Sequence, residues 1–211
     1  MFVKTFPVGP LQCNCSIIAC PETKEAAIID PGGDADHIIA LCEKEGFKIK
    51  YLLHTHAHFD HFVGSREVKE KTGASICLHK EDQWLYDNLD MQGRLFGFSF
   101  DTPLPVDHFI NDEEELSIGN LKTKVIHTPG HTPGSTCFSL AEKDSVLFAG
   151  DTLFEGSIGR TDLWGGSFEQ IIKSIKGRLF VELDDSTEVI TGHGPSTSIW
   201  AERNNNPFVG E

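Results

Sequence analysis

The 211 residues predict one α/β domain in which two β-sheets pack together and helices cover their outer faces. Two observations support this prediction. Short apolar runs bounded by glycine, proline or aspartate recur along the chain, as expected for strands. Segments with apolar residues at helical spacing follow such runs in both halves. No linker or low-complexity segment interrupts the chain, so a single domain spanning residues 1–211 is expected.

The first half of the chain alternates predicted strands with two predicted helices. The third strand ends in the turn signal at residues 30–33, and an amphipathic helix follows around residues 38–42. A second helix is expected to begin with Asp60 as its N-cap and to run through residue 68. The strands are predicted at residues 2–8, 14–20, 25–30, 48–54 and 74–78.

The second half begins with an irregular segment at residues 81–106. Its aromatic residues indicate either the wall of a pocket or a loop folded onto the core. An acidic turn at residues 112–115 precedes the hairpin signal Gly119-Asn120. Helices are predicted at residues 168–180 and 196–204. The aromatic residues concerned are Trp84, Tyr86, Phe96, Phe98 and Phe100, and the later strands are predicted at residues 121–128, 136–140, 145–149 and 188–191.

The composition argues against several classes of partner. A formal net charge of −14 argues against nucleic acid, because phosphate binding needs a basic face. No stretch of about 18 apolar residues and no secretory signal is present, so we expect neither a membrane span nor secretion. The six cysteines are expected to be reduced, buried thiols of a cytoplasmic protein, with a zinc role for Cys13 and Cys15 as the alternative. The oligomeric state is not predicted.

The sequence from residue 55 to 61 holds a cluster of ligand-type side chains directly after the apolar run 51–53. In extended backbone, side chains two residues apart point the same way, so His56 and His58 can converge on one point. Asp60 and His61 then serve a neighbouring centre across a turn. Imidazole and carboxylate ligands suit zinc and borderline transition metals. Buried together without a cation, these groups would remain unpaired, so we interpret the cluster as a metal site.

Three later residues share the same context, because each follows an apolar strand beside glycine or proline. They are His131, Asp151 and His193. Strand ends can aim loop side chains at a common point, and glycine allows the close approach of a substrate. Together with the first cluster, these residues supply the number of ligands that two metal ions need.

The ordered set His56-x-His58-x-Asp60-His61, His131, Asp151 and His193 resembles the metallo-β-lactamase superfamily. Residues 150–162, and the stretch that runs from His193-Gly194-Pro195 to residue 208, are similar to the small bacterial glyoxalase II-like hydrolases. The resemblance implies a four-layer αββα sandwich with two mixed β-sheets and outer helices. It also implies that metal ions are held between the two sheets.

Roles for individual residues follow from this resemblance. It implies that three histidines hold a first metal and three residues a second, with Asp151 bridging both ions and Asp30 supporting the site. The implied cofactors are two Zn²⁺ ions per chain, with iron or manganese as alternatives in one or both positions. Asp60 is also the implied catalytic residue, which orients the hydroxide. The first set is His56, His58 and His131, and the second is Asp60, His61 and His193.

The resemblance implies hydrolysis of a small-molecule thioester by a hydroxide that bridges the two metals, with S-D-lactoylglutathione as the expected substrate. Arg160 lies where the family places a basic substrate-binding residue, and an ion pair with Asp162 is the alternative. Most of the family's basic glutathione contacts have no counterpart here, so weak glutathione binding is expected.

The alternative activity is that of a persulfide dioxygenase, which shares the fold but uses one iron held by two histidines and an aspartate to oxidise glutathione persulfide. β-Lactam hydrolysis is not expected, because a bridging aspartate is typical of the hydrolase branch. Metal binding without catalysis is not expected either, since an open coordination position is typical of catalytic sites.

Overall fold

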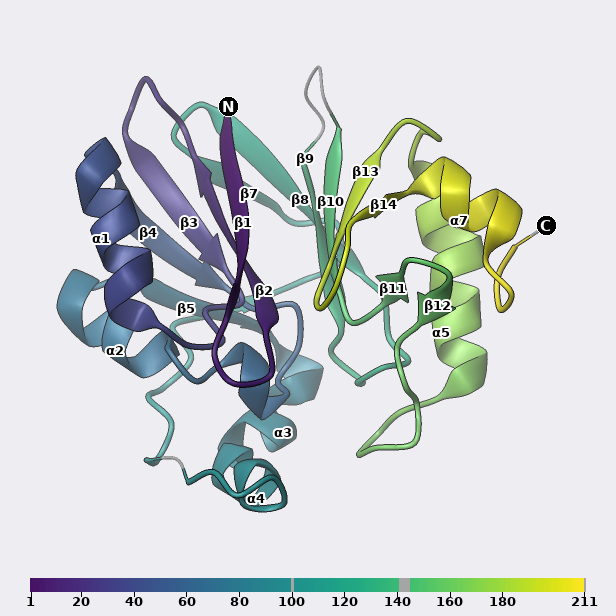
Figure 1. The fold of residues 1–211 in the computed structure, drawn as a ribbon, viewed down its shortest axis with the longest axis horizontal. Coiled ribbons are helices and arrows are strands. Elements are labelled where there is room, and N and C mark those ends of the chain that lie inside the picture. Colours follow the sequence, from purple (N-terminus) through teal and green to yellow (C-terminus); the bar gives the residue numbers. More distant parts are fainter. Residues whose placement is uncertain (100, 141–144, 211) are drawn as a thin grey trace.

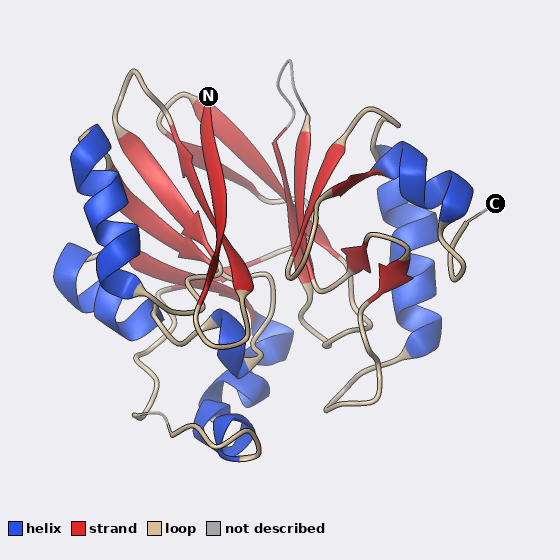
Figure 2. Ribbon diagram, in the orientation of Figure 1, coloured by secondary structure: helices blue, strands red, loops and turns tan. Residues whose placement is uncertain are grey.

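The computed structural model describes residues 1–99, 101–140 and 145–210. Two six-stranded mixed sheets face each other, and helices cover both outer faces (Figures 1 and 2). The predicted αββα sandwich is therefore confirmed. Phe100, which belongs to the predicted aromatic segment, lies outside the described residues.

The first sheet has the strand order β1-β2-β3-β4-β5-β6. Its first three strands are antiparallel, whereas β3 to β6 are parallel neighbours. Helices α1 (Ala35–Glu45) and α2 (Ser65–Thr72) cover its outer face (Figure 1). The strands are β1 Phe2–Val8, β2 Cys13–Ala19, β3 Glu25–Ile29, β4 Lys48–Leu53, β5 Ser75–His79 and β6 His108–Ile110.

The second sheet has the order β14-β13-β10-β9-β8-β7, and only β10 and β13 pair in parallel. Its outer face is covered by α5 and by α7 (Ile199–Asn205). The predicted helix at 168–180 is α5 (Phe168–Ser174), continued by a π-helical turn at Ile175–Leu179 and by α6 (Phe180–Glu182). The strands are β7 Glu115–Ile118, β8 Leu121–His127, β9 Thr136–Leu140, β10 Val146–Gly150, β13 Glu188–Thr191 and β14 Thr197–Ser198, with a separate hairpin of β11 Leu153–Phe154 and β12 Ser157–Ile158.

The core forms three apolar layers. The central layer lies between the sheets, where Leu53 from β4 meets Phe138 from β9 and Phe148 from β10. The outer layers join each sheet to its helices, as Ile38 of α1 and Ile171 of α5 illustrate. Because the sheets are covered on both faces, strands such as β2 and β10 are buried along almost their whole length, which explains the unbroken apolar run of β10.

Two local predictions are wrong. The helix expected from Asp60 begins at Ser65, after a 3-10 turn at Phe59–His61, and Gly64 is its N-cap. Asp60 does not cap this helix, because its carboxylate is near His61 and His193. The segment expected to be irregular contains a 3-10 turn at Lys80–Asp82 and the short helices α3 (Gln83–Asp87) and α4 (Leu89–Arg94).

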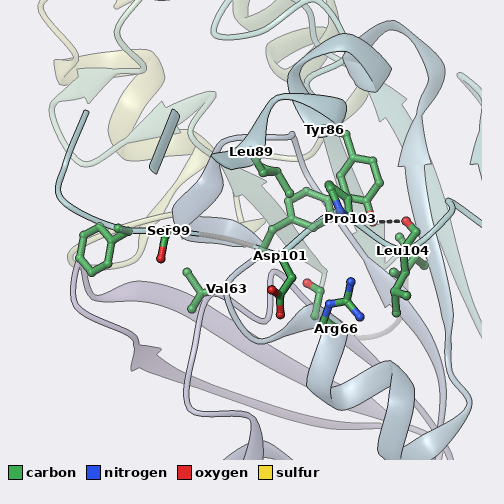
Figure 3. Close-up of a pocket in the computed structure, with 12 residues that line it drawn as sticks. Val63, Arg66, Tyr86, Leu89, Ser99, Asp101, Pro103 and Leu104 are labelled. Atoms are coloured by element: carbon green, nitrogen blue, oxygen red, sulfur yellow. Dashed lines mark hydrogen bonds between the residues drawn. The ribbon is translucent and has the colours of Figure 1, made fainter. Parts of the chain in front are cut away.

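The aromatic segment both packs onto the core and lines a cavity, the two alternatives that the sequence suggested. Tyr86 packs into the core, and its hydroxyl donates to Leu104 O at 2.6 Å (dashed in Figure 3). Tyr86 and Phe98 also line a cavity of about 230 Å³. Figure 3 shows the side chains of Arg66 and Asp101 beside this cavity. No histidine or cysteine is among its described lining residues.

Two predictions from composition concern the cysteines and membrane spans. All six cysteines are free and buried, as predicted. Within the described ranges, no helix has both the length and the apolar character needed to cross a membrane.

Candidate metal centre

The seven predicted ligands come together at one edge of the sandwich. Strands β8, β10 and β13 run in the same direction, so the residues that follow them meet at that edge. The loop after β4 in the facing sheet completes the cluster. The side chains that the fold gathers there are His56, His58, Asp60, His61, His131, Asp151 and His193.

The first group consists of His56, His58 and His131, and all three side chains are buried. His131 Nε2 lies 3.2 Å from His56 Nε2 and 2.9 Å from His58 Nδ1. Three ring nitrogens therefore converge on one point.

In His56 and His131, the ring nitrogen that points away from the other two rings has its own partner. These contacts show which nitrogen of the ring carries the lone pair. His56 Nδ1 lies 3.0 Å from Thr55 Oγ1, and His131 Nδ1 lies 2.7 Å from Arg160 O. Because the Arg160 carbonyl only accepts, His131 Nδ1 is the protonated nitrogen, and its Nε2 presents a lone pair to the other two rings. A cation satisfies such converging lone pairs, so this group fits a metal ion.

The second group consists of Asp60, His61 and His193. Asp60 Oδ2 lies 3.1 Å from His193 Nε2 and 3.8 Å from His61 Nε2. Acceptors again hold the outer nitrogens, since His193 Nδ1 donates to Leu11 O at 3.1 Å and His61 Nδ1 to Asp30 Oδ2 at 3.0 Å. The inner nitrogens and the carboxylate are thus free to bind a second ion.

Asp151 lies between the two groups. Its Oδ1 is 3.5 Å from His61 Nε2 and 3.8 Å from His193 Nε2, whereas its Oδ2 is 3.5 Å from His131 Nε2. Both Asp151 Oδ1 and His61 Nε2 are buried without a hydrogen-bond partner among the described residues. A carboxylate that presents one oxygen to each group fits a bridge between two ions. The assignment of each ligand to an ion stays a prediction.

Burial and neighbouring charges set the protonation of these residues. Burial, reinforced by His131, lowers the pKa of His58 to about 3, so this ring stays neutral and can bind a metal. Burial alone would also lower the pKa of His61, but Cys13, Asp30 and the other nearby acidic groups raise it well above its usual value. A divalent cation beside His61 would take the place of that proton. The nitrogen and oxygen donors suit zinc, iron or manganese.

Two glycines leave room for atoms of the site. A Cβ on Gly192 would lie 2.0 Å from Asp151 Oδ1, and a Cβ on Gly150 (φ +50°) would lie 2.3 Å from Thr55 Oγ1. The sequence suggested that glycine here admits a substrate. At these two positions the space is filled by protein atoms instead.

Asp82 is a supporting residue that the sequence did not reveal. It is fully buried, and its Oδ2 accepts hydrogen bonds from Ala57 N and Thr132 Oγ1, both at 2.8 Å. Its Oδ1 accepts from Gly134 N at 2.6 Å. This carboxylate thus ties the loop of His56 and His58 to the loop of His131. The only signal in the sequence was an acidic residue a few positions after a predicted strand.

The remaining histidines do not join the centre. His79 and His127 belong to a group with Glu81, but their rings stack at 4.1 Å and 18° instead of converging. His127 Nε2 also donates to Pro133 O at 2.9 Å. His54 stacks on Phe62 at 3.5 Å. None of the ligand groups among the described residues contains a cysteine, so the alternative zinc role of the cysteine pair gains no support.

A cavity of about 160 Å³ opens onto the metal ligands. Arg160, for which the resemblance implies substrate binding, is among its lining residues, and that role stays a prediction. The ion pair that was the alternative is also present, with Arg160 Nε 2.7 Å from Asp162 Oδ1 and Nη2 2.8 Å from Oδ2. The apolar part of the wall is formed by Leu11, Phe59, Phe96, Leu163 and Trp164.

Comparison with known proteins identifies relatives of this chain. The family model of the Metallo-beta-lactamase superfamily matches residues 8–193 of this chain. Hydroxyacylglutathione hydrolase GloC of Haemophilus influenzae is 40% identical over 211 residues, which cover 99% of this chain and 98% of that protein. Probable metallo-hydrolase YqgX of Bacillus subtilis is 39% identical over 208 residues, which cover 98% and 96%.

Solved structures share the whole fold. The BLEG-1 B3 metallo-beta-lactamase has a TM-score of 0.90 and 39% identity, with 100% of both chains covered. TTHA1623 in a di-iron-bound form has a TM-score of 0.86 and 35% identity, covering 99% of this chain and 100% of that one. This chain therefore belongs to the metallo-beta-lactamase superfamily, and its histidine-rich site is that of a metal-dependent hydrolase.

Proposed function

We propose that this protein is a binuclear zinc thioesterase that acts on glutathione thioesters such as S-D-lactoylglutathione. The observation that carries the proposal is the position of Asp151, whose two oxygens lie 3.5 Å from His61 Nε2 and 3.5 Å from His131 Nε2. This arrangement suits two adjacent ions that share a water molecule. The likeness to GloC, a relative named hydroxyacylglutathione hydrolase, supports the choice of substrate.

Two zinc ions, when bound, lower the pKa of a shared water to about 7 and polarise the thioester carbonyl. Asp60 orients the attacking oxygen. Although burial alone would raise the pKa of Asp60, His61 and His193 lower it, so the side chain stays an ionised acceptor. A carbon–oxygen bond forms, the carbon–sulfur bond breaks, and the electron pair leaves with sulfur as a thiolate. The products are a carboxylic acid and a free thiol.

The chain's other side chains shape the cavity around the reacting groups. Phe96, Trp164 and Leu11 contribute apolar surface that limits the access of water. Trp164 packs edge-on to His58 at 6.4 Å. These contacts hold the thioester near the ligands without providing a charge for its remote carboxylates.

Arg160 is the cation that we assign to glutathione. Its guanidinium is already paired with Asp162, so a glutathione carboxylate has to compete with that partner, and a weak Michaelis constant is expected. Arg160→Ala should lower kcat/KM on S-D-lactoylglutathione about tenfold, since an exposed charged hydrogen bond lies at the lower end of its usual range. Asp162→Asn is the matched variant, because it frees the guanidinium and should not lower kcat/KM.

The first test is hydrolysis of S-D-lactoylglutathione by the zinc-loaded protein, measured as thiol release together with metal content. Release of thiol in proportion to bound zinc supports the proposal. No release, with zinc fully bound, contradicts it.

A second candidate is an iron-dependent persulfide dioxygenase. TTHA1623 was solved in a di-iron-bound form, so a related site holds iron, although the dioxygenase uses a single iron. Oxygen uptake with glutathione persulfide by the iron-loaded protein distinguishes the two activities. A chromogenic cephalosporin serves as a further test substrate, because BLEG-1 is named a B3 metallo-beta-lactamase. We expect no cephalosporin hydrolysis.

A further inference from the structure

The ligands of the second group come from both sheets. Asp60 and His61 follow β4 of the first sheet, whereas His193 follows β13 of the second (Figure 1). The position of His193 relative to the other two ligands therefore depends on how the loop between β13 and β14 is placed against the first sheet. A contact that fixes this loop to the first sheet would set the geometry of the second group.

Asn14, at the start of β2 in the first sheet, makes such a contact. Its Nδ2 donates to Thr191 O and to Gly194 O, both at 2.9 Å. Its backbone N donates to Gly192 O at 2.8 Å. One residue thus binds three backbone carbonyls, on either side of His193. Because carbonyl oxygens only accept, the amide nitrogen is the side-chain atom that faces them.

The hydrogen bonds inside the loop set its shape but not its placement. Thr191 Oγ1 donates to His193 O at 2.7 Å and to Pro195 O at 3.0 Å, so both bonds stay within the second sheet and its loop. They would move with the loop as one unit. The side chain of Asn14 instead joins one sheet to the other.

The part of the first sheet that carries Asn14 is itself closely packed. A Cβ on Gly9, in the turn before β2, would lie 2.4 Å from Gly32 O, so this turn lies against the loop after β3. Cys13, the residue before Asn14, is buried, and its Sγ lies 3.4 Å from His61 Nδ1. The same short segment therefore contacts both histidines of the second group or the backbone around them.

We propose that Asn14 is a positioning residue, whose side-chain amide places His193 and thereby sets the affinity of the second metal ion. This inference rests on the two-ion centre of the proposed function. Asn14 belongs to none of the ligand groups among the described residues, and it holds only the backbone around His193. The ring keeps a separate hydrogen bond, from Nδ1 to Leu11 O. Ligands that are oriented before binding hold a metal more tightly, because less freedom is lost when the ion binds.

The test is Asn14→Leu, which keeps a branched side chain of similar size but donates no side-chain hydrogen bond. Competition with a chelator measures the affinities of both zinc ions. We expect the second ion to bind about 10-fold to 100-fold more weakly than in the wild type, whereas the affinity of the first ion stays unchanged.

Thr5→Val is the matched control. It removes a hydrogen bond of the same hairpin, between Thr5 Oγ1 and Ser16 Oγ at 2.7 Å, that involves no ligand residue. Both zinc affinities should stay unchanged. An unchanged second affinity in Asn14→Leu would overturn the role of Asn14, and so would an equal loss in Thr5→Val. If Asn14→Leu does not fold, Asn14→Ala takes its place with the same expected and contradicting results.

A second measurement does not depend on the number of ions. Crystal structures of the metal-free wild type and of Asn14→Leu show where the ring of His193 lies. We expect the variant's ring to leave its place 3.1 Å from Asp60 Oδ2. A ring that keeps this place would overturn the role of Asn14.

These measurements separate the role of Asn14 from the proposed function. If the wild type bound only one zinc ion, the two-ion centre would fail, and the position of His193 alone would decide whether Asn14 places it. An absence of thioester hydrolysis would contradict the proposed activity and would change neither measurement.

Discussion

The two ligand groups of the metal centre differ in how firmly the fold holds them. In the first group, the exposed fractions are 1% for His56, 6% for His58 and 2% for His131. In the second group, the side chain of His61 is buried, whereas those of Asp60 and His193 are 14% and 28% exposed. The first group lies inside the protein, whereas part of the second group lies at its edge.

The supporting contacts differ in the same direction. Asp82 ties together the two loops that carry the first group, through Ala57 N and Thr132 Oγ1 at 2.8 Å and Gly134 N at 2.6 Å. In the second group, His61 is held at its outer nitrogen by Asp30 Oδ2, whereas the more exposed His193 is held there by a single backbone carbonyl, Leu11 O. Ligands that are oriented in advance bind a metal more tightly. The difference therefore predicts a tighter ion in the first group and a weaker, more accessible ion in the second.

The largest effect is expected from removing Asp151, the residue that lies between both groups. Asp151→Ala should lose one metal ion per chain and lower hydrolysis by about 10³-fold or more, because the bridge and its charge disappear. Elemental analysis and steady-state kinetics provide the measurement. Two ions retained at full occupancy would show that Asp151 does not bridge.

His193→Ala tests the second group alone. We expect the variant to keep the ion of the first group, because the substitution leaves the ligands of that ion unchanged. The ion of the second group should be lost. Metal content should fall from two ions to about one. Loss of both ions would show that the two groups do not bind independently.

Thr132→Val tests the support of the first group without touching a ligand. Removing the hydroxyl that donates to Asp82 should weaken binding of the tighter ion by about 10-fold to 100-fold, which is typical for contacts that orient ligands. Competition with a chelator measures this affinity. Thr132→Ser is the matched control, since it keeps the hydroxyl. Equal metal affinities for the two variants would show that the hydrogen bond between Thr132 and Asp82 does not support the first group.

The smallest effect is expected for His127→Ala. His127 also follows a strand, but its Nε2 donates to Pro133 O and does not face the centre. Metal content and most of the activity should therefore be retained. A loss of metal comparable to that of His131→Ala would mean that His127, not His131, is the ligand.

The sequence predicted the members of the metal centre because their spacing reflects local geometry. His56 and His58 lie two residues apart after a strand, and His131, Asp151 and His193 each follow another strand. These patterns depend on backbone direction alone, which a run of apolar residues already indicates.

What the sequence could not predict depends on which loops meet in space. Asp82 and Gln92 belong to no recognisable motif. Each forms a hydrogen bond with the backbone of Ala57, which is 25 residues from Asp82 and 35 residues from Gln92. The helix predicted from Asp60 was wrong for a related reason. Asp60 has the chemistry of an N-cap, but it lies beside His61 and His193, whose contacts outweigh the local preference for a helix start.

The two ligand groups should hold two ions of unequal affinity. Anomalous diffraction from crystals loaded with one or two equivalents of zinc shows which group binds each ion. With one equivalent, we predict a single peak among His56, His58 and His131, and with two equivalents a second peak beside His61 and His193. A single peak at two equivalents, or a first ion bound in the second group, would contradict the account.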